Sequence, residues 1–375
     1  MTIGYDAKRA FLNNTGLGNY SRWLIKAVAS YYPGHEYRLY TPQVKENRHY
    51  AFLKKIPHTH IFSPKSKLLS SWWRSKGIVK DLQADGVQLY HGLSHELPFG
   101  IRQSNIKCVL TVHDLIFMRF PQYFGFINRA IYKTKLQYAC KAADHIIAIS
   151  HKTKQDLIEL LKVDSSKIEV LYQGCDPAIK LHQSDAQRKL VKKKYDLPKR
   201  YVLTVGTIEE RKNLLLLAKS LLHTKGSVPL IVVGKPTEYL DKVKAFINAN
   251  NLTQRVIFLH DVSFDELPAL YQMATLFVYP SRYEGFGIPV LEAINSGVPV
   301  IAAKGSCLEE AGGPDSLYTD PDDEQELAKH INRIWNSPAV RQQMIAKGFD
   351  YARNFDDEKL AGQLMQLYQN TLNHA

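Results

Sequence analysis

Short apolar runs that alternate with longer helical patterns restrict the fold of this chain more than any other feature of its sequence. Runs of this kind occur in both halves of the chain. They cover residues 2–7, 37–42, 87–92, 107–114, 145–150 and 168–174, and then 201–207, 229–235, 255–261, 275–280 and 299–303. Strands that alternate with helices form parallel sheets covered by helices. The sequence therefore predicts an α/β protein with two doubly wound, Rossmann-like domains that face each other across a cleft.

A polar, basic segment over residues 175–200 divides the chain and lacks apolar periodicity. At 375 residues the chain is long for one hydrophobic core, and a segment of this composition is typical of a domain junction. We therefore expect a first domain over residues 1–174, a linker over 175–200 and a second domain over 201–355. An amphipathic helical pattern, preceded by a break, occupies residues 356–375.

A glycine loop in the second half places two carboxylates, Glu284 and Glu292, eight residues apart in the segment "EGFGIPVLE". Pro289 suits the first turn of a short helix there. Gly285 and Gly287 let a ligand approach the backbone, and the unpaired amides at the start of the helix favour an anion such as phosphate. Carboxylates repel phosphate but accept hydrogen bonds from a vicinal diol. A diphosphate flanked by polyols, as in a sugar nucleotide, suits both the anion site at the helix start and the two carboxylates. The alternative is that Glu292 is a solvated helix residue and that the glycines only form a tight turn.

Composition limits the partners and the compartment. The net charge of +13 implies an anionic partner, which is nucleic acid, an anionic membrane surface or a phosphorylated small molecule. No apolar run reaches membrane-spanning length, and the start "MTIGYDAKRAF" lacks the apolar core of a signal peptide, so we expect a cytoplasmic protein. The cysteines lie far apart without a Cys-x-x-Cys pair, so we expect neither disulfides nor a metal site.

Several short motifs follow one another along nearly the whole chain. They are "TGLGNY" (15–20), "YHG" (90–92), "TVHDL" (111–115), "ADHIIAIS" (143–150), "YQGCDP" (172–177), "VGTIEERKN" (205–213) and "EGFGIPVLE" (284–292). Their order and spacing resemble glycosyltransferase family 4, a family of retaining enzymes with the GT-B fold. The resemblance implies that the second domain binds a nucleotide sugar, that the first binds the acceptor, and that the helix 356–375 returns to complete the first domain.

The resemblance also implies roles for residues of the second domain. It assigns the ribose hydroxyls to Glu292, hydroxyls of the donor sugar to Glu284, and the diphosphate to Arg211 and Lys212. Cleavage of the sugar–phosphate bond builds negative charge on the diphosphate, which nearby fixed cations stabilise. Thr207 stands where many relatives carry an arginine, so Arg211 alone supplies the planar donor. The donor-binding candidates are Gly16, Gly18, Gly206, Arg211, Lys212, Val262, Gly285, Phe286, Gly287 and Glu292.

The first domain supplies the other candidates. His113 and Asp114 end a predicted strand, where ligands gather in open α/β sheets. By resemblance, His113 reaches the donor sugar or the acceptor hydroxyl at the reaction centre; the alternative is a structural histidine. The catalytic candidates are thus His113, Glu284, Arg211 and Lys212, and the acceptor-side candidates are Asn19, Tyr20, His91 and Asp114.

Together these expectations describe a retaining hexosyltransferase that uses a nucleoside diphosphate sugar and needs no metal or other cofactor. We expect mannose transfer from GDP-mannose to a glycan or lipid-linked acceptor in surface polysaccharide synthesis, because "GTIEERKN" and "TVHDLI" are most similar to mannosyltransferase relatives. The alternatives are a UDP-sugar-dependent transferase, a sugar nucleotide 2-epimerase and a basic nucleic-acid-binding protein. An NAD-dependent dehydrogenase is disfavoured, because "GLGNYS" matches the dinucleotide fingerprint poorly and "YRLYTPQ" lacks the ribose-binding acid.

Two further segments have competing interpretations. The Asp-x-Asp in "TDPDDE" (319–324) has the spacing of a divalent-cation site, but the helix that follows favours helix caps. The segment "PKSKLLSSWWRSK" (64–76) combines Lys65, Lys67, Arg74 and Lys76 with leucines and tryptophans. It is either a basic helix on an anionic membrane surface or a helix that buries its tryptophans in the first domain. We slightly favour the first alternative, which places the protein at the inner face of the membrane.

Overall fold

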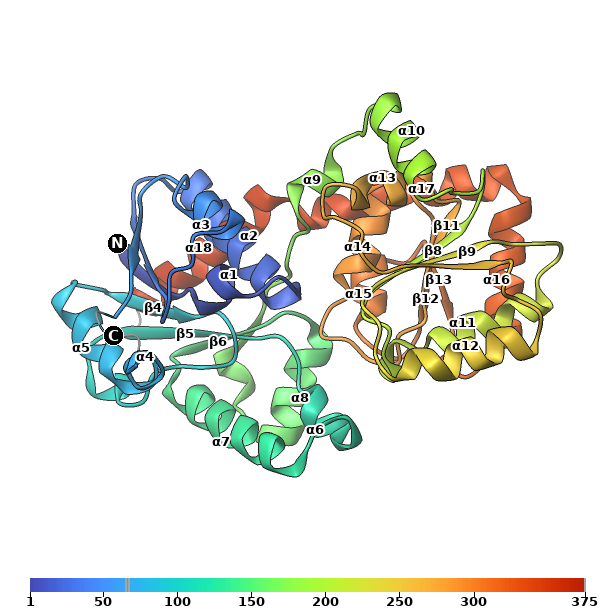
Figure 1. The fold of residues 1–375 in the computed structure, drawn as a ribbon. Helices are drawn as coiled ribbons and strands as arrows, with labels where there is room; N and C mark the ends of the chain where they lie inside the picture. Colours follow the sequence, from blue (N-terminus) through green and yellow to red (C-terminus); the bar gives the residue numbers. More distant parts are fainter. Residues whose placement is uncertain (65, 67, 374–375) are drawn as a thin grey trace. The chain divides into compact units, whose positions relative to one another are not determined.

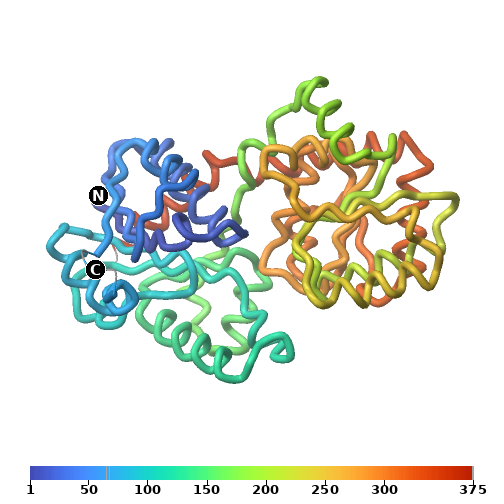
Figure 2. The backbone as a smooth tube through the Cα atoms, in the orientation of Figure 1, coloured from blue at the N-terminus to red at the C-terminus, as the bar shows by residue number. Residues whose placement is uncertain are grey.

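The chain folds into two compact units (Figures 1 and 2). The structure is a computed structural model that describes residues 1–64, 66 and 68–373. The first unit comprises Met1–Gly174 and Phe355–Ala375, and the second comprises Cys175–Asn354. Phe355, which the sequence places in the second domain, belongs to the first, where its ring packs 5.4 Å from the ring of Tyr172.

Each unit is built on one sheet, and all neighbouring strands in the described residues run parallel. In the first unit the order is β3-β2-β1-β4-β5-β6-β7, and in the second it is β10-β9-β8-β11-β12-β13. The first sheet consists of β1 (Thr2–Asp6), β2 (Glu36–Tyr40), β3 (Thr59–Phe62), β4 (Leu89–Gly92), β5 (Lys107–Val112), β6 (His145–Ala148) and β7 (Ile168–Val170). The second consists of β8 (Val202–Val205), β9 (Leu230–Val233), β10 (Val256–Leu259), β11 (Leu276–Tyr279), β12 (Val300–Ala303) and β13 (Leu317–Thr319).

Helices cover both faces of each sheet, as Figure 1 shows. Those of the first unit are α1 (Lys8–Leu12), α2 (Gly16–Tyr31), α3 (Arg48–Leu53), α4 (Ser70–Trp72), α5 (Ile78–Ala84), α6 (Ile116–Arg119), α7 (Phe126–Ala142), α8 (His151–Leu161) and α18 (Asp357–Asn373). Those of the second are α9 (Pro177–Lys180), α10 (Asp185–Lys194), α11 (Leu214–Ser220), α12 (Tyr239–Ala249), α13 (Leu267–Met273), α14 (Ile288–Asn295), α15 (Leu308–Gly312), α16 (Glu324–Asn336) and α17 (Pro338–Ala352). The predicted α/β fold with two parallel-sheet units is confirmed.

The strands have continuous apolar sequences because helices bury both faces of each sheet. All four residues of β9, β11 and β12 are buried, as expected for parallel strands between helical layers. In the second unit, Leu217 of α11, Val243 of α12 and Ile331 of α16 pack into one core with alternate residues of the strands. This packing leaves the carboxyl ends of the strands, and the loops that follow them, to form the site.

Helix α18 belongs to the first unit although residues 175–354 separate it from the rest of that unit. It packs against α2 and β5. Trp23 of α2 donates a hydrogen bond from Nε1 to Oδ1 of Asp357 at 3.0 Å, and Leu360 and Leu364 are buried. The helix therefore completes the core of the first unit.

Residues 175–200 are not a separate linker but part of the second unit. They form α9 and α10, and α10 packs against α13. Lys194 and Tyr195 hold it there through the carboxylate of Glu266, at 2.6 and 2.8 Å. The sequence indicates a linker because only scattered apolar residues of this segment, Ile179, Val191 and Leu197, are buried against the second unit, and they form no regular pattern.

The membrane-facing interpretation of residues 64–76 fits only part of that segment. Lys65 and Lys67 lie outside the described residues. Trp73 is buried and donates from Nε1 to Asp81 at 2.5 Å, whereas Leu69 and Trp72 are exposed. Across the described part of the chain, every helix is too short or too polar to span a bilayer.

Candidate active site

The strand order of the second sheet reverses between β8 and β11. Two neighbouring strands therefore send their following loops in opposite directions, which leaves a crevice at their carboxyl ends where open α/β sheets bind ligands. The loop after β8 carries Arg211 and Lys212, and the loop after β11 carries Glu284. The fold thus brings together side chains that lie about seventy residues apart in the sequence.

Glu284 is the centre of this site. Its Oε1 lies 2.5 Å from Nζ of Lys212 and 2.9 Å from Nη1 of Arg211, and it accepts hydrogen bonds from Ser281 Oγ at 2.6 Å and the Tyr279 hydroxyl at 3.1 Å. Burial opposes ionisation, but Lys212, Arg211 and Ser281 outweigh it and lower the pKa of Glu284 to about 2. The carboxylate is therefore ionised at neutral pH. All four contacts end on Oε1, so Oε2 takes part in none of them.

The two cations are fixed by further contacts. Arg211 also pairs with Glu209 at 2.5 Å and donates to the carbonyl oxygen of Tyr283. Burial opposes its charge, but Glu284 and Glu209 raise its pKa above the usual value. Lys212 lies over the ring of Tyr279, 4.9 Å from the centroid, and donates to its hydroxyl at 2.5 Å. Both cations are thus preorganised at the switch point.

Glycines shape both loops. Gly287 has φ 112° and caps α14, and a methyl group there would lie 2.6 Å from Leu308, so a side chain would meet both strain and a clash. Gly206 follows β8 and lines a pocket with Thr207, Lys212 and Tyr279. Gly285 and Phe286 lie in the Glu284 loop, and Cys307 Sγ lies 3.0 Å from the carbonyl oxygen of Glu284 and 3.1 Å from that of Phe286.

Glu292 lies on α14, buried, in a different environment. Its Oε2 accepts a hydrogen bond from the hydroxyl of Tyr271 at 2.9 Å. Burial raises its pKa to about 7, although that hydrogen bond opposes the shift, and the nearby charge of Asp176 adds to it. Pro289 occupies the first turn of α14, as the sequence predicts, and Gly297, with φ 71°, follows the end of the helix.

Val262 is half-buried in the loop after β10. In the sheet, β9 separates β10 from β8. Val262 therefore lies at the carboxyl ends of the strands, as Arg211 and Glu284 do, but not in the two loops that follow β8 and β11.

In the first unit, His113 directly follows β5 and is buried. Its Nε2 donates to the carbonyl oxygen of Leu93 at 2.8 Å, which leaves the lone pair of the neutral ring on Nδ1. Tyr20 packs edge-on to the ring at 4.6 Å, and His95 stacks on it at 5.4 Å. Burial, together with the charge of His95, lowers the pKa of His113 to about 3, so the imidazole is neutral at physiological pH.

His91 and Tyr20, predicted on the acceptor side, are instead buried members of one hydrogen-bonded chain. His91 Nδ1 bonds to the hydroxyl of Tyr368 at 2.6 Å, and His91 Nε2 bonds to Thr111 Oγ1 at 2.8 Å. The hydroxyl of Tyr20 also reaches Thr111 Oγ1, at 3.0 Å, and Tyr368 reaches Tyr5 at 3.3 Å. Both nitrogens of His91 are occupied, so the structure gives it a structural role that ties α18 to the sheet.

The remaining first-unit candidates lie at loop and helix starts. Gly16 is exposed at the first residue of α2, while Gly18 lies so close to the preceding loop that a methyl group there would meet the carbonyl oxygen of Asn13 at 2.0 Å. Asn19 is exposed and accepts from Arg22 at 2.6 Å. Asp114 accepts from the amide of Ile116 at 3.0 Å.

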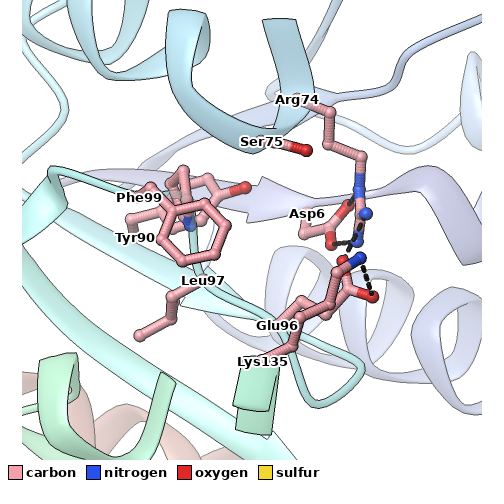
Figure 3. Close-up of a pocket in the computed structure, with 9 residues that line it drawn as sticks. Asp6, Arg74, Ser75, Tyr90, Glu96, Leu97, Phe99 and Lys135 are labelled. Atoms are coloured by element: carbon pink, nitrogen blue, oxygen red, sulfur yellow. Dashed lines mark hydrogen bonds and ion pairs between the residues drawn. The ribbon is translucent and has the colours of Figure 1, made fainter. Parts of the chain in front are cut away.

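A polar pocket of the first unit, shown in Figure 3, lies beside β1 and β4. Arg74 pairs there with Asp6 at 2.5 Å and with Glu96 at 2.6 Å, and Lys135 lies 3.6 Å from Glu96. The exposed ring of Phe99 lines the same pocket. Arg74, predicted to face a membrane, thus lies between two carboxylates, with 12% of its side chain exposed.

The acidic segment 319–324 is used as a helix cap. Asp323 accepts from the amides of Gln325 and Glu326 at the start of α16, and Asp322 pairs with Arg282 at 2.5 Å. No group of three acidic, histidine or cysteine side chains suited to a metal ion occurs in the described residues. The four cysteines are buried, and none forms a disulfide.

Sequence reasoning missed three residues of the second-unit site. Tyr279 and Ser281 contact Glu284, and Tyr271 contacts Glu292. Their only signal in the sequence is position, since Tyr279 ends a strand and Ser281 follows it. Tyr271 lies on α13, and only the fold brings it to α14.

Comparisons with known proteins agree with this geometry. A family model described as Glycosyltransferase Family 4 matches residues 15–179, and one described as Glycosyl transferases group 1 matches residues 185–351. O-antigen chain mannosyltransferase B of Escherichia coli is 29% identical over 95% of this chain and 96% of its own length. O-antigen chain mannosyltransferase RfbU of Salmonella typhimurium is 31% identical over 67% of this chain and 66% of its own length.

Solved structures show the same fold at low identity. A glycosyltransferase from Rickettsia africae has a TM-score of 0.77 at 17% identity, over 100% of this chain and 99% of its own. Anabaena HepE in complex with UDP and glucose has a TM-score of 0.76 at 18% identity, over 99% and 100%. The two-sheet fold is therefore GT-B, and the family models and curated relatives identify the protein as a glycosyltransferase. Within that class, the chain belongs to glycosyltransferase family 4, as the order of its motifs predicted.

Proposed function

We propose that this enzyme transfers mannose from GDP-mannose, with retention of configuration, to a glycan or lipid-linked acceptor in surface polysaccharide synthesis. The observation that carries the proposal is the Glu284–Arg211–Lys212 cluster at the switch point of the second sheet. A buried carboxylate that neutralises two fixed cations is suited to a ligand with one anionic part and one hydroxyl-rich part.

Arg211 and Lys212 bind the diphosphate in this proposal. A diphosphate competes with Glu284 for the two cations, because it carries more negative charge than one carboxylate. Glu284 then accepts hydrogen bonds from hydroxyls of the donor sugar. Its Oε2 suits this role, because the contacts with Arg211, Lys212, Tyr279 and Ser281 all end on Oε1. Glu292, one turn inside α14, accepts from the ribose diol in its ionised form.

The chemical step needs little covalent participation from the protein. The acceptor hydroxyl oxygen forms a bond to the anomeric carbon while the bond from that carbon to the diphosphate oxygen breaks. The departing diphosphate takes the acceptor proton on the same face, which keeps the configuration. The cations stabilise the charge that develops on the leaving group more than the charge of the bound donor.

His113 is the first-unit residue that we assign to substrate. Its ring is neutral, and the hydrogen bond to Leu93 fixes the tautomer with Nδ1 as acceptor. It therefore accepts a hydrogen bond from a hydroxyl of the donor sugar or the acceptor and does not act as a cation.

Mannose is proposed because two relatives, which match 95% and 67% of the chain, are bacterial O-antigen mannosyltransferases. Arg211 and Lys212 supply the positive charge that a metal ion supplies to diphosphates elsewhere, so we propose a metal-independent reaction. The proposed location is the cytoplasm, at the inner face of the membrane where lipid-linked acceptors are presented.

A thermal shift panel with GDP, UDP, ADP, GDP-mannose, UDP-sugars and NAD, each with and without EDTA, tests the donor. A ligand at about 100 times its dissociation constant adds roughly 2.7 kcal/mol to the free energy of unfolding. We expect stabilisation by GDP and GDP-mannose that is insensitive to EDTA and is lost in Glu292→Ala. Stabilisation by UDP compounds alone supports the UDP-sugar alternative, and stabilisation by none of the nucleotides contradicts the proposed site.

A product analysis then distinguishes transfer from epimerisation. GDP-mannose is incubated with the protein and a lipid extract that contains lipid-linked glycans, and the sugar products are identified by NMR. We expect GDP and a mannosylated glycan with retained anomeric configuration. An epimer of the nucleotide sugar, formed without the extract, identifies a 2-epimerase instead.

A further inference from the structure

The first sheet has a switch point of its own. Its strand order reverses between β1 and β4, as that of the second sheet reverses between β8 and β11. Open α/β sheets bind ligands at the carboxyl ends of the strands beside such a reversal. Asp6 is the last residue of β1, and the loop after β4 carries Glu96 and Phe99. These residues line the pocket of Figure 3 together with Arg74 and Lys135, so the pocket lies at the switch point of the first sheet.

The charges of the side chains that line this pocket cancel. Arg74 donates from Nη2 to Asp6 Oδ2 at 2.5 Å, from Nε to Asp6 Oδ1 at 3.2 Å and from Nη1 to Glu96 Oε2 at 2.6 Å. Lys135 faces the same Glu96, and Lys8 also acts on its charge. A phosphate in this pocket would meet two carboxylates and an arginine that is already paired. An uncharged ligand with hydroxyl groups meets no such repulsion, because a hydroxyl both donates to carboxylates and accepts from cations.

Glu96 and Lys135 are the members of this network that a ligand can reach. Their side chains are 31% and 41% exposed, whereas those of Asp6 and Arg74 are 4% and 12% exposed. The distance of 3.6 Å between Lys135 Nζ and Glu96 Oε1 is longer than a hydrogen bond. A ligand hydroxyl is therefore able to bond to both groups, while the Arg74–Asp6 pair forms the inner part of the pocket.

An exposed aromatic ring lines the same pocket. Phe99 is 40% exposed, its ring packs against Tyr138 with the centroids 4.5 Å apart, and its amide donates to the carbonyl oxygen of Ser75 at 2.7 Å. The ring is thus held in place although part of it faces solvent. One face of a sugar ring presents C–H groups and its edge presents hydroxyls. A fixed aromatic ring beside Glu96 and Lys135 matches both parts.

The loop after β4 joins this pocket to His113. His95 stacks on His113 at 5.4 Å and accepts a hydrogen bond from its amide at 3.2 Å, and the next residue is Glu96. His95 has φ 64°, a left-handed conformation that is unfavourable for a residue other than glycine. Oγ of Ser94 is buried and, in the part of the chain that the structure describes, has no hydrogen-bond partner. A strained loop with an unpaired hydroxyl is better explained by ligand binding than by folding.

We propose that this pocket is the subsite for an uncharged sugar ring of the acceptor glycan, which stacks on Phe99 and bonds through its hydroxyls to Glu96 and Lys135. The inference rests on the proposed function and adds the chemistry of the acceptor to it. A ring bound here lies beside the loop that contacts His113, which is the first-unit residue assigned to substrate. The phosphate of a lipid-linked acceptor binds elsewhere, because two carboxylates line this pocket.

Saturation-transfer NMR on the full chain, without any nucleotide, tests this subsite independently of the donor. The probes are methyl α-mannoside, methyl α-glucoside and methyl N-acetyl-α-glucosaminide, with mannose 6-phosphate as the anionic counterpart. We expect saturation transfer to at least one uncharged glycoside and a weaker affinity for mannose 6-phosphate.

Two variants separate stacking from charge. Phe99→Ala removes the stacking surface, and we expect roughly tenfold weaker binding of that glycoside, with Phe99→Tyr close to wild type. Glu96→Gln keeps the shape of the side chain but leaves Arg74 and Lys135 with excess positive charge. We expect this variant to bind the uncharged glycoside more weakly and mannose 6-phosphate more tightly than wild type does, which reverses the preference. A network that only supports the fold would not exchange one ligand for the other.

Phe126→Ala and Glu36→Gln are the matched controls. Phe126 is 77% exposed on α7 of the same unit, and Glu36 pairs with His60 on the surface of that unit. We expect both variants to bind like wild type. The proposal is overturned if no uncharged glycoside binds, if Phe99→Ala binds as wild type does, or if wild type prefers mannose 6-phosphate.

Nucleotide stabilisation separates a failure of this subsite from a failure of the proposed function. If GDP-mannose stabilises the protein but no glycoside binds, the subsite alone is wrong. If Phe99→Ala weakens glycoside binding while no nucleotide stabilises the protein, the subsite stands and the proposed function is contradicted. In transfer assays with the lipid extract, Phe99→Ala is expected to raise the KM for the acceptor roughly tenfold and to leave the KM for the donor unchanged.

Discussion

Buried titratable candidates occur in both units, but they differ in charge. In the second unit Glu284 is ionised, with a pKa of about 2, because Lys212 and Arg211 lie within 3 Å. In the first unit the imidazoles of His91 and His113 are neutral, with pKa values of about 3, because burial dominates and the carboxylate of Asp114 opposes the shift of His113 only in part. Burial thus removes charge unless an opposite charge is built in beside it.

Glu292 shows that the hydrogen-bond or ion-pair partner of a buried group, and not the unit in which it lies, decides whether the group keeps its charge. It belongs to the same loop and helix as Glu284, yet its partner is the neutral hydroxyl of Tyr271, and its pKa rises to about 7. The second unit therefore combines a permanently charged carboxylate with one that titrates near neutral pH.

The largest effect is expected from breaking the charged cluster. Lys212→Ala removes one preorganised stabiliser of leaving-group charge, and we expect turnover with the nucleotide sugar to fall roughly 100- to 1,000-fold. Steady-state rates at saturating donor measure this loss. Lys219→Ala, on the exposed side of α11, is the control and is expected to retain activity; a wild-type rate in Lys212→Ala contradicts the assignment.

Glu292→Gln tests the titrating carboxylate. The folded pKa of about 7 exceeds the usual value of 4.5, so the unliganded protein loses stability as pH rises from about 4.5 to 7 and stays less stable above it. The glutamine variant lacks this loss, so we expect it to equal wild type near pH 4.5 and to exceed it by up to about 3 kcal/mol at pH 8 in urea unfolding.

The same carboxylate sets a pH dependence of binding. Because the ribose diol needs the ionised form, wild-type nucleotide affinity is expected to fall as pH drops below about 7. Calorimetric titration at several pH values measures it. In Tyr271→Phe the opposing hydrogen bond is gone, so the fall should begin at a higher pH; an affinity that does not vary with pH excludes the ribose role.

His113→Ala sharpens the contrast with the neutral site. We expect a roughly tenfold or greater loss of transfer with nucleotide affinity unchanged, because the proposed role of the residue is to contact the reacting sugar or hydroxyl and not the nucleotide. Since its pKa is about 3, its removal should leave the shape of the pH profile above pH 5 unchanged. His60→Ala, at an exposed histidine, is the control, and unfolding of His113→Ala would identify a structural residue.

The smallest effect is expected from the buried network. Tyr368→Phe removes the hydroxyl that bonds to His91 at 2.6 Å and to Tyr5 at 3.3 Å, and about 1–2 kcal/mol of stability should be lost. Urea unfolding measures the loss, with Tyr31→Phe on the surface as the control. Transfer activity at low temperature should be unchanged, since the network serves packing.

The sequence predicts the central strands better than the edges of the sheets. Both strands that its apolar pattern omits, β3 and β13, are edge strands. They bury fewer residues than central strands such as β9 or β12. Since an edge strand needs an apolar side chain only where a helix covers it, its sequence resembles that of a loop.

The site was predictable where it depends on strand ends and not where it depends on side-chain direction. Glu284, Arg211 and Lys212 follow neighbouring strands, so topology alone brings them together. His91 ends a strand as well, but all residues of β4 are buried, and a continuous apolar run does not reveal which way a side chain points. Tyr271 and Tyr279 are missed for the same reason, because their partners are set by helix and strand packing.

The return of α18 to the first unit has a consequence for the order of synthesis. The second unit is one continuous stretch, Cys175–Asn354, so it can reach its native fold as soon as that stretch has left the ribosome. The first unit is made earlier but lacks a wall of its core until residues 357–373 have emerged. The part of the chain translated first is therefore the last to mature, and until then the surfaces of α2 and β5 that α18 later covers lack their partner.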